Sequence, residues 1–186
     1  MNYNQAKTIA DYLVGLFAPH CERVAIAGSI RREKPEPKDI EILAIPKFVP
    51  EQRGIFTGVD FPDDPSPTVS ALDPVLAEIG TLVKGGPRYK QFMLREGIHL
   101  DLFLVLPPSQ WGVQFTIRTG PGDFSKWLVT PKRQGGALPS YLSVHEGALW
   151  NGKDMVPTPE EIDFFDAIGL QWIEPCKRVP AWRKAP

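Results

Sequence analysis

The sequence predicts an α+β protein, and three observations support that class. Residues 6–17 carry apolar side chains at the i, i+3, i+4 spacing of an amphipathic helix, and Pro19 ends the pattern. The run "DIEILAI" (39–45) alternates polar and apolar residues before it becomes fully apolar, which is typical of a strand. The runs "RYKQFML" (88–94) and "IHLDLFLVL" (98–106) flank the short turn "REG", which favours a β-hairpin. Separate helical and strand segments of this kind indicate α+β organisation.

The remaining segments complete the outline of the chain. "RVAIAG" (23–28) predicts a buried strand, and "SIRREK" (29–34) predicts one helical turn that the following prolines stop. Residues 46–70 hold five prolines and two glycines without periodicity, which predicts a long surface loop. Residues 71–83 predict a helix with Pro74 in its first turn. Further along we expect a short helix and two strands, at residues 123–129, 141–147 and 148–152.

The last predicted helix has the clearest boundary signals. Thr158 is expected to be its N-cap, Pro159 its first residue and Glu161 the third-position partner of a capping box. Gly169 can close the helix in the left-handed conformation. One apolar stripe along this helix consists of Ile162, Phe165 and Ile168.

Composition indicates a soluble globular chain. The 186 residues are 42% hydrophobic and 23% charged. No run of 18 apolar residues occurs, so we expect no membrane span, and the N-terminus lacks a signal-peptide pattern. Cys21 and Cys176 match no metal-ligand spacing and are expected to be free thiols in a reducing, cytoplasmic compartment.

The net charge of −1 does not by itself indicate a nucleic-acid binder. Net charge is a poor guide, however, where charges of opposite sign are segregated along the chain. Basic residues gather in four places from which folding could build a cleft, at residues 31–34, 84–90, 126–133 and 177–184.

Three carboxylates carry the candidate chemistry. Asp39 and Glu41 project from the same face of their predicted strand, because they are two residues apart. Asp101 interrupts an otherwise apolar strand, where an unpaired buried carboxylate would cost several kcal/mol. If the two strands are neighbours, the three acids meet and repel one another, and a pair of divalent ions such as Mg²⁺ would relieve the repulsion. The alternative is an ordinary half-buried strand whose isoleucines face the core and whose acids face water.

A Gly-Ser turn and two arginines lie just upstream of the acid pair. Gly28 follows a predicted buried strand and lets the backbone approach a ligand, while Ser29 adds a hydroxyl donor. Arg31 and Arg32 offer planar, permanently charged forks that suit phosphate oxygens. The alternative is a plain strand-turn-helix with solvated arginines.

Several motifs occur in an order typical of one polymerase family. "GSIRREKPEPKDIE" (28–41) holds Gly-Ser-x-Arg-Arg followed by the acid pair, and "HLDLFLVLPPSQWG" (99–112) carries the third acid. "IRTGPGDFSKWL" (117–128) contains a Thr-Gly step, and the segment 157–178 ends in Glu-Pro-x-x-Arg. Together with the Lys-Gly run in "LVKGGPRYKQFML", these segments resemble the family X DNA polymerases, the group of DNA polymerase beta and terminal deoxynucleotidyl transferase. The resemblance extends over most of the chain.

The resemblance implies a fold and an activity. Residues 1–107 would form a nucleotidyltransferase palm, with a mixed, mostly antiparallel sheet of about five strands and helices on one face. Residues 108–186 would form a smaller α+β thumb lobe. The implied activity is two-metal nucleotidyl transfer to a primer 3′-hydroxyl on a DNA primer-template or gapped duplex, as in the gap-filling or short-patch synthesis of DNA repair and replication. The expected protein is a monomer with two Mg²⁺ ions as cofactors and Mn²⁺ as an alternative.

The resemblance also assigns roles to single residues. Asp39 and Glu41 would bridge both metal ions, and Asp101 would complete the ion that activates the 3′-hydroxyl. The triphosphate would lie on residues after the first strand: Gly28, Ser29, Arg31 and Arg32. The nucleotide pocket would be formed by residues of the Thr-Gly segment: Thr119, Gly120, Phe124, Ser125 and Lys126. Arg178 would help position the second lobe against the first.

Two departures from the family pattern leave other functions open. Glu41 stands where the family has a second aspartate, which puts the preference between Mg²⁺ and Mn²⁺ in question. Ile117 and Arg118 stand where several members have an aromatic pair, so discrimination between ribose and deoxyribose could be loose. One alternative is a template-independent nucleotidyltransferase that acts on DNA or RNA ends. Another is a nucleic-acid-binding protein that keeps the fold without turnover.

Overall fold

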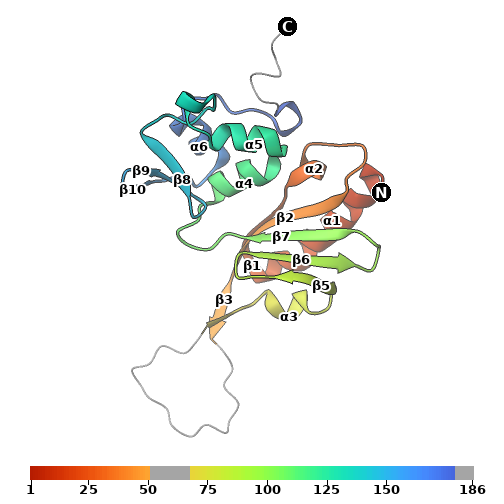
Figure 1. Ribbon diagram of the computed structural model, residues 1–186. Coiled ribbons are helices and arrows are strands. Elements are labelled where there is room, and N and C mark those ends of the chain that lie inside the picture. Colours follow the sequence, from red (N-terminus) through yellow and green to blue (C-terminus); the bar gives the residue numbers. More distant parts are fainter. Residues whose placement is uncertain (51–67, 179–186) are drawn as a thin grey trace, which may run out of the picture.

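A computed structural model describes residues 1–50 and 68–178 and shows two lobes (Figure 1). The first lobe is built on a five-stranded sheet in the order β1–β2–β7–β6–β5. Its strands are β1 (Cys21–Ile26), β2 (Asp39–Pro46), β7 (His99–Leu104), β6 (Tyr89–Leu94) and β5 (Gly80–Gly85). Only β2 and β7 run parallel; the other three neighbouring pairs are antiparallel. The prediction of an α+β protein with a mixed, mostly antiparallel sheet is confirmed.

One face of the sheet packs on helix α1 (Tyr3–Phe17). The helix begins at the N-cap Asn2, which forms a capping box with Gln5. It is followed by the 3₁₀ turn η1 (Ala18–His20), which contains Pro19. Alternation along the strands places the even-numbered residues of β2 and β7 against α1, among them Ile40, Ile42, Leu100 and Leu102. The short helix α3 (Asp73–Leu76) joins the same core through Leu76. The odd-numbered residues therefore face the other side.

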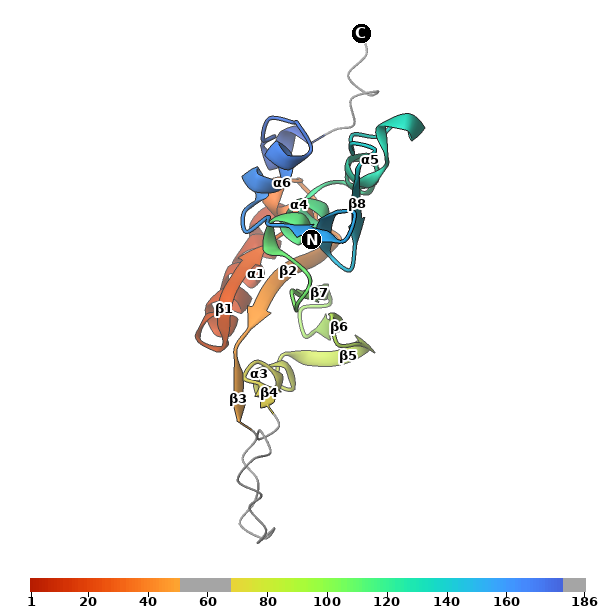
Figure 2. The ribbon, with the colours of Figure 1, turned by 90° about the vertical axis from the view of Figure 1, so that its left-hand side faces the viewer.

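The second lobe has its own core and lies against that other face. It contains α4 (Trp111–Thr119), α5 (Gly122–Val129), the 3₁₀ turn η2 (Lys132–Gln134), β8 (Leu142–His145), β9 (Ala148–Asn151), β10 (Asp154–Val156), α6 (Glu161–Ala167) and the 3₁₀ turn η3 (Pro175–Lys177). Trp111 of α4 packs on Leu43 and Phe103 of the sheet. Figure 2 shows α5, α6 and β8 gathered at one end of the molecule and β3 (Phe48–Pro50) and β4 (Thr68–Ser70) at the other.

Several local predictions are confirmed. β6 and β7 form the expected antiparallel hairpin, and β8 and β9 form a second hairpin. Gly28–Arg31 forms the one-turn helix α2. Cys21 is buried, Cys176 is exposed, and both are free thiols. Gly169 adopts the left-handed conformation, with φ of 74°. Within the described residues no helix is both long and apolar enough to cross a membrane.

The helix predicted for residues 71–83 is largely wrong. Only Asp73–Leu76 is helical, and the chain from Gly80 to Gly85 is the edge strand β5. The open edge of β6 offers backbone partners, as in the pairing of Thr81 with Met93, and this ladder outweighs the weak helical preference of β-branched residues. The predicted loop at 46–70 is also shorter than expected, because β3 and β4 pair across it. Residues 51–67 lie outside the described part.

The predicted start of the last helix is wrong by two residues. The N-cap of α6 is Glu160, which forms a capping box with Asp163. The hydroxyl of Thr158 is buried and donates to the Gln110 side chain, so it is not available as a cap. Glu161 is instead drawn into an ion-pair network, and Ile162 of the predicted apolar stripe is exposed. Thr158 and Glu161, which local capping rules assign to the start of the helix, are therefore engaged in tertiary contacts instead.

Candidate active site

The three predicted acids lie side by side on one face of the sheet. In the parallel pairing of β2 and β7, Glu41 is the register partner of Asp101, and Asp39 is the partner of His99. Because side chains alternate along each strand, Asp39, Glu41 and Asp101 all face the second lobe, away from α1. Sequence spacing alone predicted that Asp39 and Glu41 share a face. The position of Asp101 beside them follows only from the pairing of β2 with β7.

The helix α2 closes one end of this acid cluster. The backbone N–H of Ser29 donates to Glu41 Oε2 at 3.3 Å. Gly28 has φ of 60°, and a Cβ there would overlap the Glu41 carboxylate. Glycine is thus required at position 28 for two reasons, its backbone conformation and its close approach to Glu41. The Ser29 hydroxyl is buried and has no hydrogen-bond partner within the described residues.

Two residues that sequence reasoning did not single out hold Asp101. The Tyr89 hydroxyl and the Gln91 amide each donate to Asp101 Oδ1 at 2.8 Å. Both side chains come from β6, where Gln91 is the register partner of Asp101. The period-two pattern of "RYKQFML" could have placed them on the acid-bearing face once the hairpin register was known. They fix the orientation of Asp101.

The electrostatics of the cluster are unfavourable. Burial, followed by the charges of Asp39 and Asp101, raises the pKa of Glu41 to about 7, although Arg32 and the Ser29 amide oppose the shift. Burial and the charge of Asp101 likewise raise the pKa of Asp39. The cluster is therefore crowded with negative charge that is only partly balanced.

We expect Glu41 to make the stability of the metal-free protein depend on pH. Its folded pKa lies above the unfolded value of 4.5, so the folded state binds more protons between pH 4.5 and 7, and the free energy of unfolding falls as pH rises through that window. The full loss is about 3 kcal/mol, reached above pH 7. Urea denaturation of the wild type and Glu41→Gln with chelator at pH 4.5 and 8 measures it. The stability advantage of the variant should grow by that amount from the lower to the higher pH; an equal difference at both values would contradict the prediction.

A cleft of about 710 Å³ opens beside the acids, between the lobes. Its lining joins Asp39 and Glu41 to Ser29, Arg32, Arg118, Gly120 and Ser125. Asp101 lies next to Glu41 but outside this lining. Arg32 donates to the Thr119 carbonyl at 2.5 Å, and its buried Nε has no partner within the described residues.

Three residues predicted to line the nucleotide pocket lie elsewhere. Phe124 is fully buried in the core of the second lobe, in the same cluster as Phe164 and Phe165 of α6. Lys126 is exposed on α5, and Thr119 is buried and bonded to Arg31. The helical geometry of α5 explains the positions of Phe124 and Lys126: Ser125 faces the cleft, so its neighbours on either side face other directions.

Arg31, which was expected to bind the triphosphate, is bound to a carboxylate of the second lobe. Its two terminal nitrogens bind Glu161 of the second lobe, Nη1–Oε1 at 2.9 Å and Nη2–Oε2 at 2.5 Å. Glu161 Oε1 also lies 2.9 Å from Arg178 Nη2, in an orientation that makes an ion pair and not a hydrogen bond. Burial alone would raise the pKa of Glu161, but the bond from Arg31 and the charges of Arg178 and Arg31 lower it. Arg31 thus links the lobes and has no fork left for phosphate, while Arg178 contacts only residues of the second lobe among its described polar partners, Ile173, Thr116 and Glu161.

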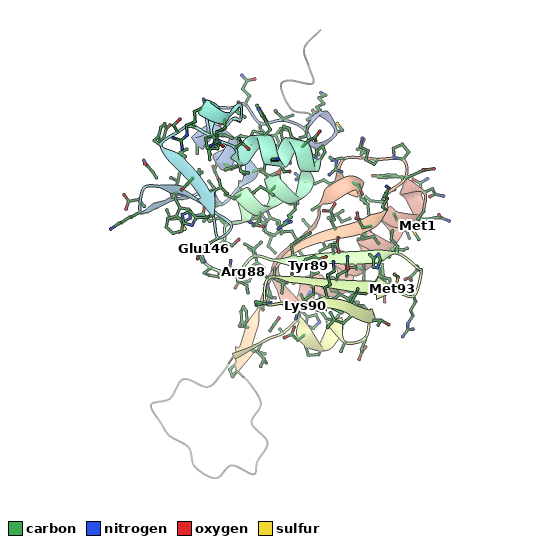
Figure 3. All side chains as sticks on the ribbon, in the orientation of Figure 1. Met1, Arg88, Tyr89, Lys90, Met93 and Glu146 are labelled. Atoms are coloured by element: carbon green, nitrogen blue, oxygen red, sulfur yellow. The ribbon has the colours of Figure 1, made fainter. Side chains whose placement is uncertain are left out.

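Other arginines of the first lobe also reach the second. Arg23 makes a two-pronged bond to Glu160, with both distances 2.7 Å, and lies over the Trp111 ring. Arg88 donates to the carbonyls of Pro107 and Glu146, at the boundary visible in Figure 3. The cleft walls are therefore held in one relative position by several charged contacts.

The acids fit divalent ions in ligand type but do not converge. An all-carboxylate donor set suits Mg²⁺. Among residues 1–50 and 68–178, no group of three His, Cys, Asp or Glu side chains is arranged to hold a metal ion. Glu41 is turned toward Ser29, and Asp101 toward Tyr89 and Gln91. Binding of Mg²⁺ would require these side chains to rotate toward one another.

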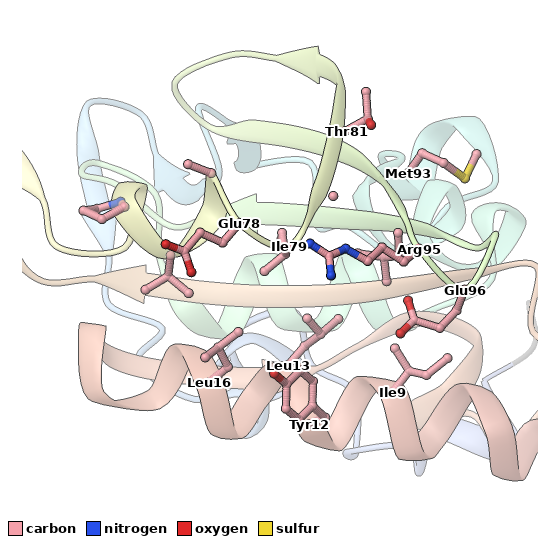
Figure 4. A pocket seen from close by; sticks show the side chains of 15 residues that line it. Ile9, Tyr12, Leu13, Leu16, Glu78, Ile79, Thr81, Met93, Arg95 and Glu96 are labelled. Carbon is pink, nitrogen blue, oxygen red and sulfur yellow. The ribbon is translucent and has the colours of Figure 1, made fainter.

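A second cleft lies on the opposite side of the sheet. It measures about 960 Å³ and lies between α1 and the strands β5 and β6 (Figure 4). Its lining is both apolar and polar, with Ile9 and Leu13 of α1 on one side and Arg95 and Glu96 at the turn after β6. None of the three clustered acids lines it, so the cleft between the lobes is the candidate site.

No family model matches the chain, and no curated protein matches it either. The molecule itself therefore defines the class: an α+β protein with a mixed five-stranded sheet and, between two lobes, a cleft whose lining includes Asp39 and Glu41.

Proposed function

We propose that the protein is a nucleotidyltransferase of the family X polymerase type, which adds nucleotides to a DNA primer 3′-hydroxyl. One observation carries the proposal: Asp101 is the register neighbour of Glu41, on the face that Asp39 shares. Three acids from two separated stretches of chain thus form one cluster beside a cleft. The family pattern requires this arrangement, and ordinary strand alternation does not.

Different residues around the cleft would bind the metal, bind the phosphates and hold the acids in position. Asp39, Glu41 and Asp101 would hold Mg²⁺, which when bound lowers the pKa of the primer hydroxyl and neutralises the triphosphate. The unpaired hydroxyl of Ser29 and the unpaired Nε of Arg32 are donors that phosphate oxygens could satisfy. Tyr89 and Gln91 orient Asp101, and the lobe contacts of Arg31 keep the cleft wall in place.

A template-independent transferase remains a second candidate. Ile117 and Arg118 line the cleft where several family members have an aromatic pair. A wall that lacks those rings could accept either sugar and tolerate an unpaired substrate end. DNA would be held by dispersed basic residues, so binding should weaken steeply with salt.

Primer extension tests the proposal. The full chain is incubated with a labelled gapped duplex, an open primer-template or a single strand, with Mg²⁺ or Mn²⁺, and with deoxyribonucleotides or ribonucleotides. We expect stepwise addition that depends on the metal and the template. Addition to the single strand at an equal rate would favour the second candidate. The complete absence of addition under all these conditions would refute both, and calorimetry with triphosphate would then show whether a binding function remains.

A further inference from the structure

Arg118 lies above the acid-bearing face of the sheet. It is the next-to-last residue of α4, and its guanidinium carbon lies 4.0 Å from the centre of the Phe103 ring. Phe103 follows Asp101 by two residues on β7 and therefore faces the same side. The Nε of Arg118 is buried and has no hydrogen-bond partner within the described residues. The Arg118 side chain is thus held by its contact with the Phe103 ring, and its Nε–H can still donate a hydrogen bond.

Two acids of the cluster, Glu41 and Asp101, lie near Arg118. Burial lowers the pKa of Arg118, and the nearby Glu41, Tyr89 and Asp101 oppose that shift. Tyr89 stacks on Phe103 at 5.2 Å and donates to Asp101, so all these groups share one patch of the sheet. Among the described residues, no ion pair within 4.0 Å fixes Arg118 to either acid. A cation held by a ring and attracted by acids at longer range can move without breaking an ion pair.

We infer that Arg118 is a tethered counterion of the acid cluster, which balances it in the absence of metal and opposes the binding of divalent ions. The inference rests on the proposed function, since it takes Asp39, Glu41 and Asp101 as the metal ligands. Arg32, at the end of α2, interacts with Glu41 and Asp39, and Arg118 of the second lobe interacts with Glu41 and Asp101. A divalent ion brought among the acids meets a positive charge that is already present, and this repulsion lowers its affinity.

The arrangement also predicts a link between metal and nucleotide. A triphosphate in the cleft gives the unpaired Nε of Arg118 a negatively charged partner, which would draw the guanidinium from the acids. Metal and triphosphate would then each favour binding of the other, as linkage requires. The metal site would remain weak until a nucleotide arrives.

Mn²⁺ binding to the full chain, measured by the loss of the free-ion electron paramagnetic resonance signal, tests the inference without turnover. We expect Arg118→Gln to bind Mn²⁺ about five- to fiftyfold more tightly than the wild type when no nucleotide is present. Arg118→Lys, which keeps the charge, should stay near the wild type. Arg118→Met, which keeps apolar contact with Phe103, provides a second neutral variant if the glutamine variant fails to fold. Arg133→Gln, at an exposed arginine of the same lobe, is the matched control and should change nothing.

The outcomes separate the inference from the proposed function. Tighter binding in a folded neutral variant, together with wild-type affinity in Arg118→Lys, supports it. Equal or weaker binding in the neutral variants, while the wild type binds Mn²⁺, overturns the counterion role and leaves the proposed function standing. The absence of Mn²⁺ binding in every variant overturns both, because the acids would then not be a metal site.

Discussion

Replacing Asp101 with asparagine is expected to lower the rate of nucleotide addition by about a hundred- to a thousandfold and to leave the fold intact. The loss corresponds to the several kcal/mol that metal-assisted charge stabilisation contributes to such reactions. Asparagine keeps an Oδ1 that can accept from Tyr89 and Gln91, so the hydrogen bonds that hold the side chain survive. Only the negative charge and one anionic oxygen are lost. Single-turnover primer extension measures the rate, and thermal unfolding measures the fold.

The control for Asp101→Asn is Glu96→Gln. Glu96 lines the cleft on the other side of the sheet and belongs to the hairpin turn that precedes Asp101 in the chain. The substitution removes one carboxylate from the same lobe and leaves the acid cluster unchanged. The extension rate of Glu96→Gln should therefore equal that of the wild type. A folded Asp101→Asn protein that retained more than about a third of the wild-type rate would remove Asp101 from the chemistry.

Replacing Glu161 with glutamine is expected to destabilise the protein by about 3–5 kcal/mol. Breaking a buried ion pair from one side leaves uncompensated charge in the interior, which is costly. Glu161 is 5% exposed and Arg178 is 1% exposed, so neither side chain can turn to water without local unfolding. Arg31 and Arg178 would be left as neighbouring cations with no anion between them. Urea denaturation at neutral pH measures the loss.

Glu160→Gln is the matched control for Glu161→Gln, because it makes the same chemical change at the next residue. Glu160 also pairs with an arginine of the first lobe, but this pair with Arg23 is largely solvent-exposed. Exposed ion pairs contribute about 0–1 kcal/mol, and glutamine can still cap α6, so a small effect is expected. Equal destabilisation by the two substitutions would contradict the expectation that burial, and not charge alone, makes the Glu161 ion pairs costly to break.

Local pattern predicted much of the fold correctly. The helix at the N-terminus, the strands β1 and β2 and the two hairpins followed from periodicity and turn residues. It missed several elements, among them β3, β4 and β10. The sequence did not predict α4, whose β-branched residues and Gly112 favour helix poorly and which depends on packing against the sheet and α6. Most of the helix expected at residues 71–83 did not form, because residues 80–85 pair with the open edge of β6 as a strand.

The candidate site divides in the same way. Sequence alone placed Asp39 and Glu41 on one face, because side chains alternate in any strand, and it placed glycine where α2 begins. Tertiary structure alone decided that Asp101 lies beside Glu41, that Tyr89 and Gln91 hold it, that Arg31 makes the contact between the lobes and that Arg118 lies over the Phe103 ring. The reason is physical: periodicity acts between residues a few positions apart, whereas strand order, register and the competition of distant charges for one partner are settled only when the whole chain packs.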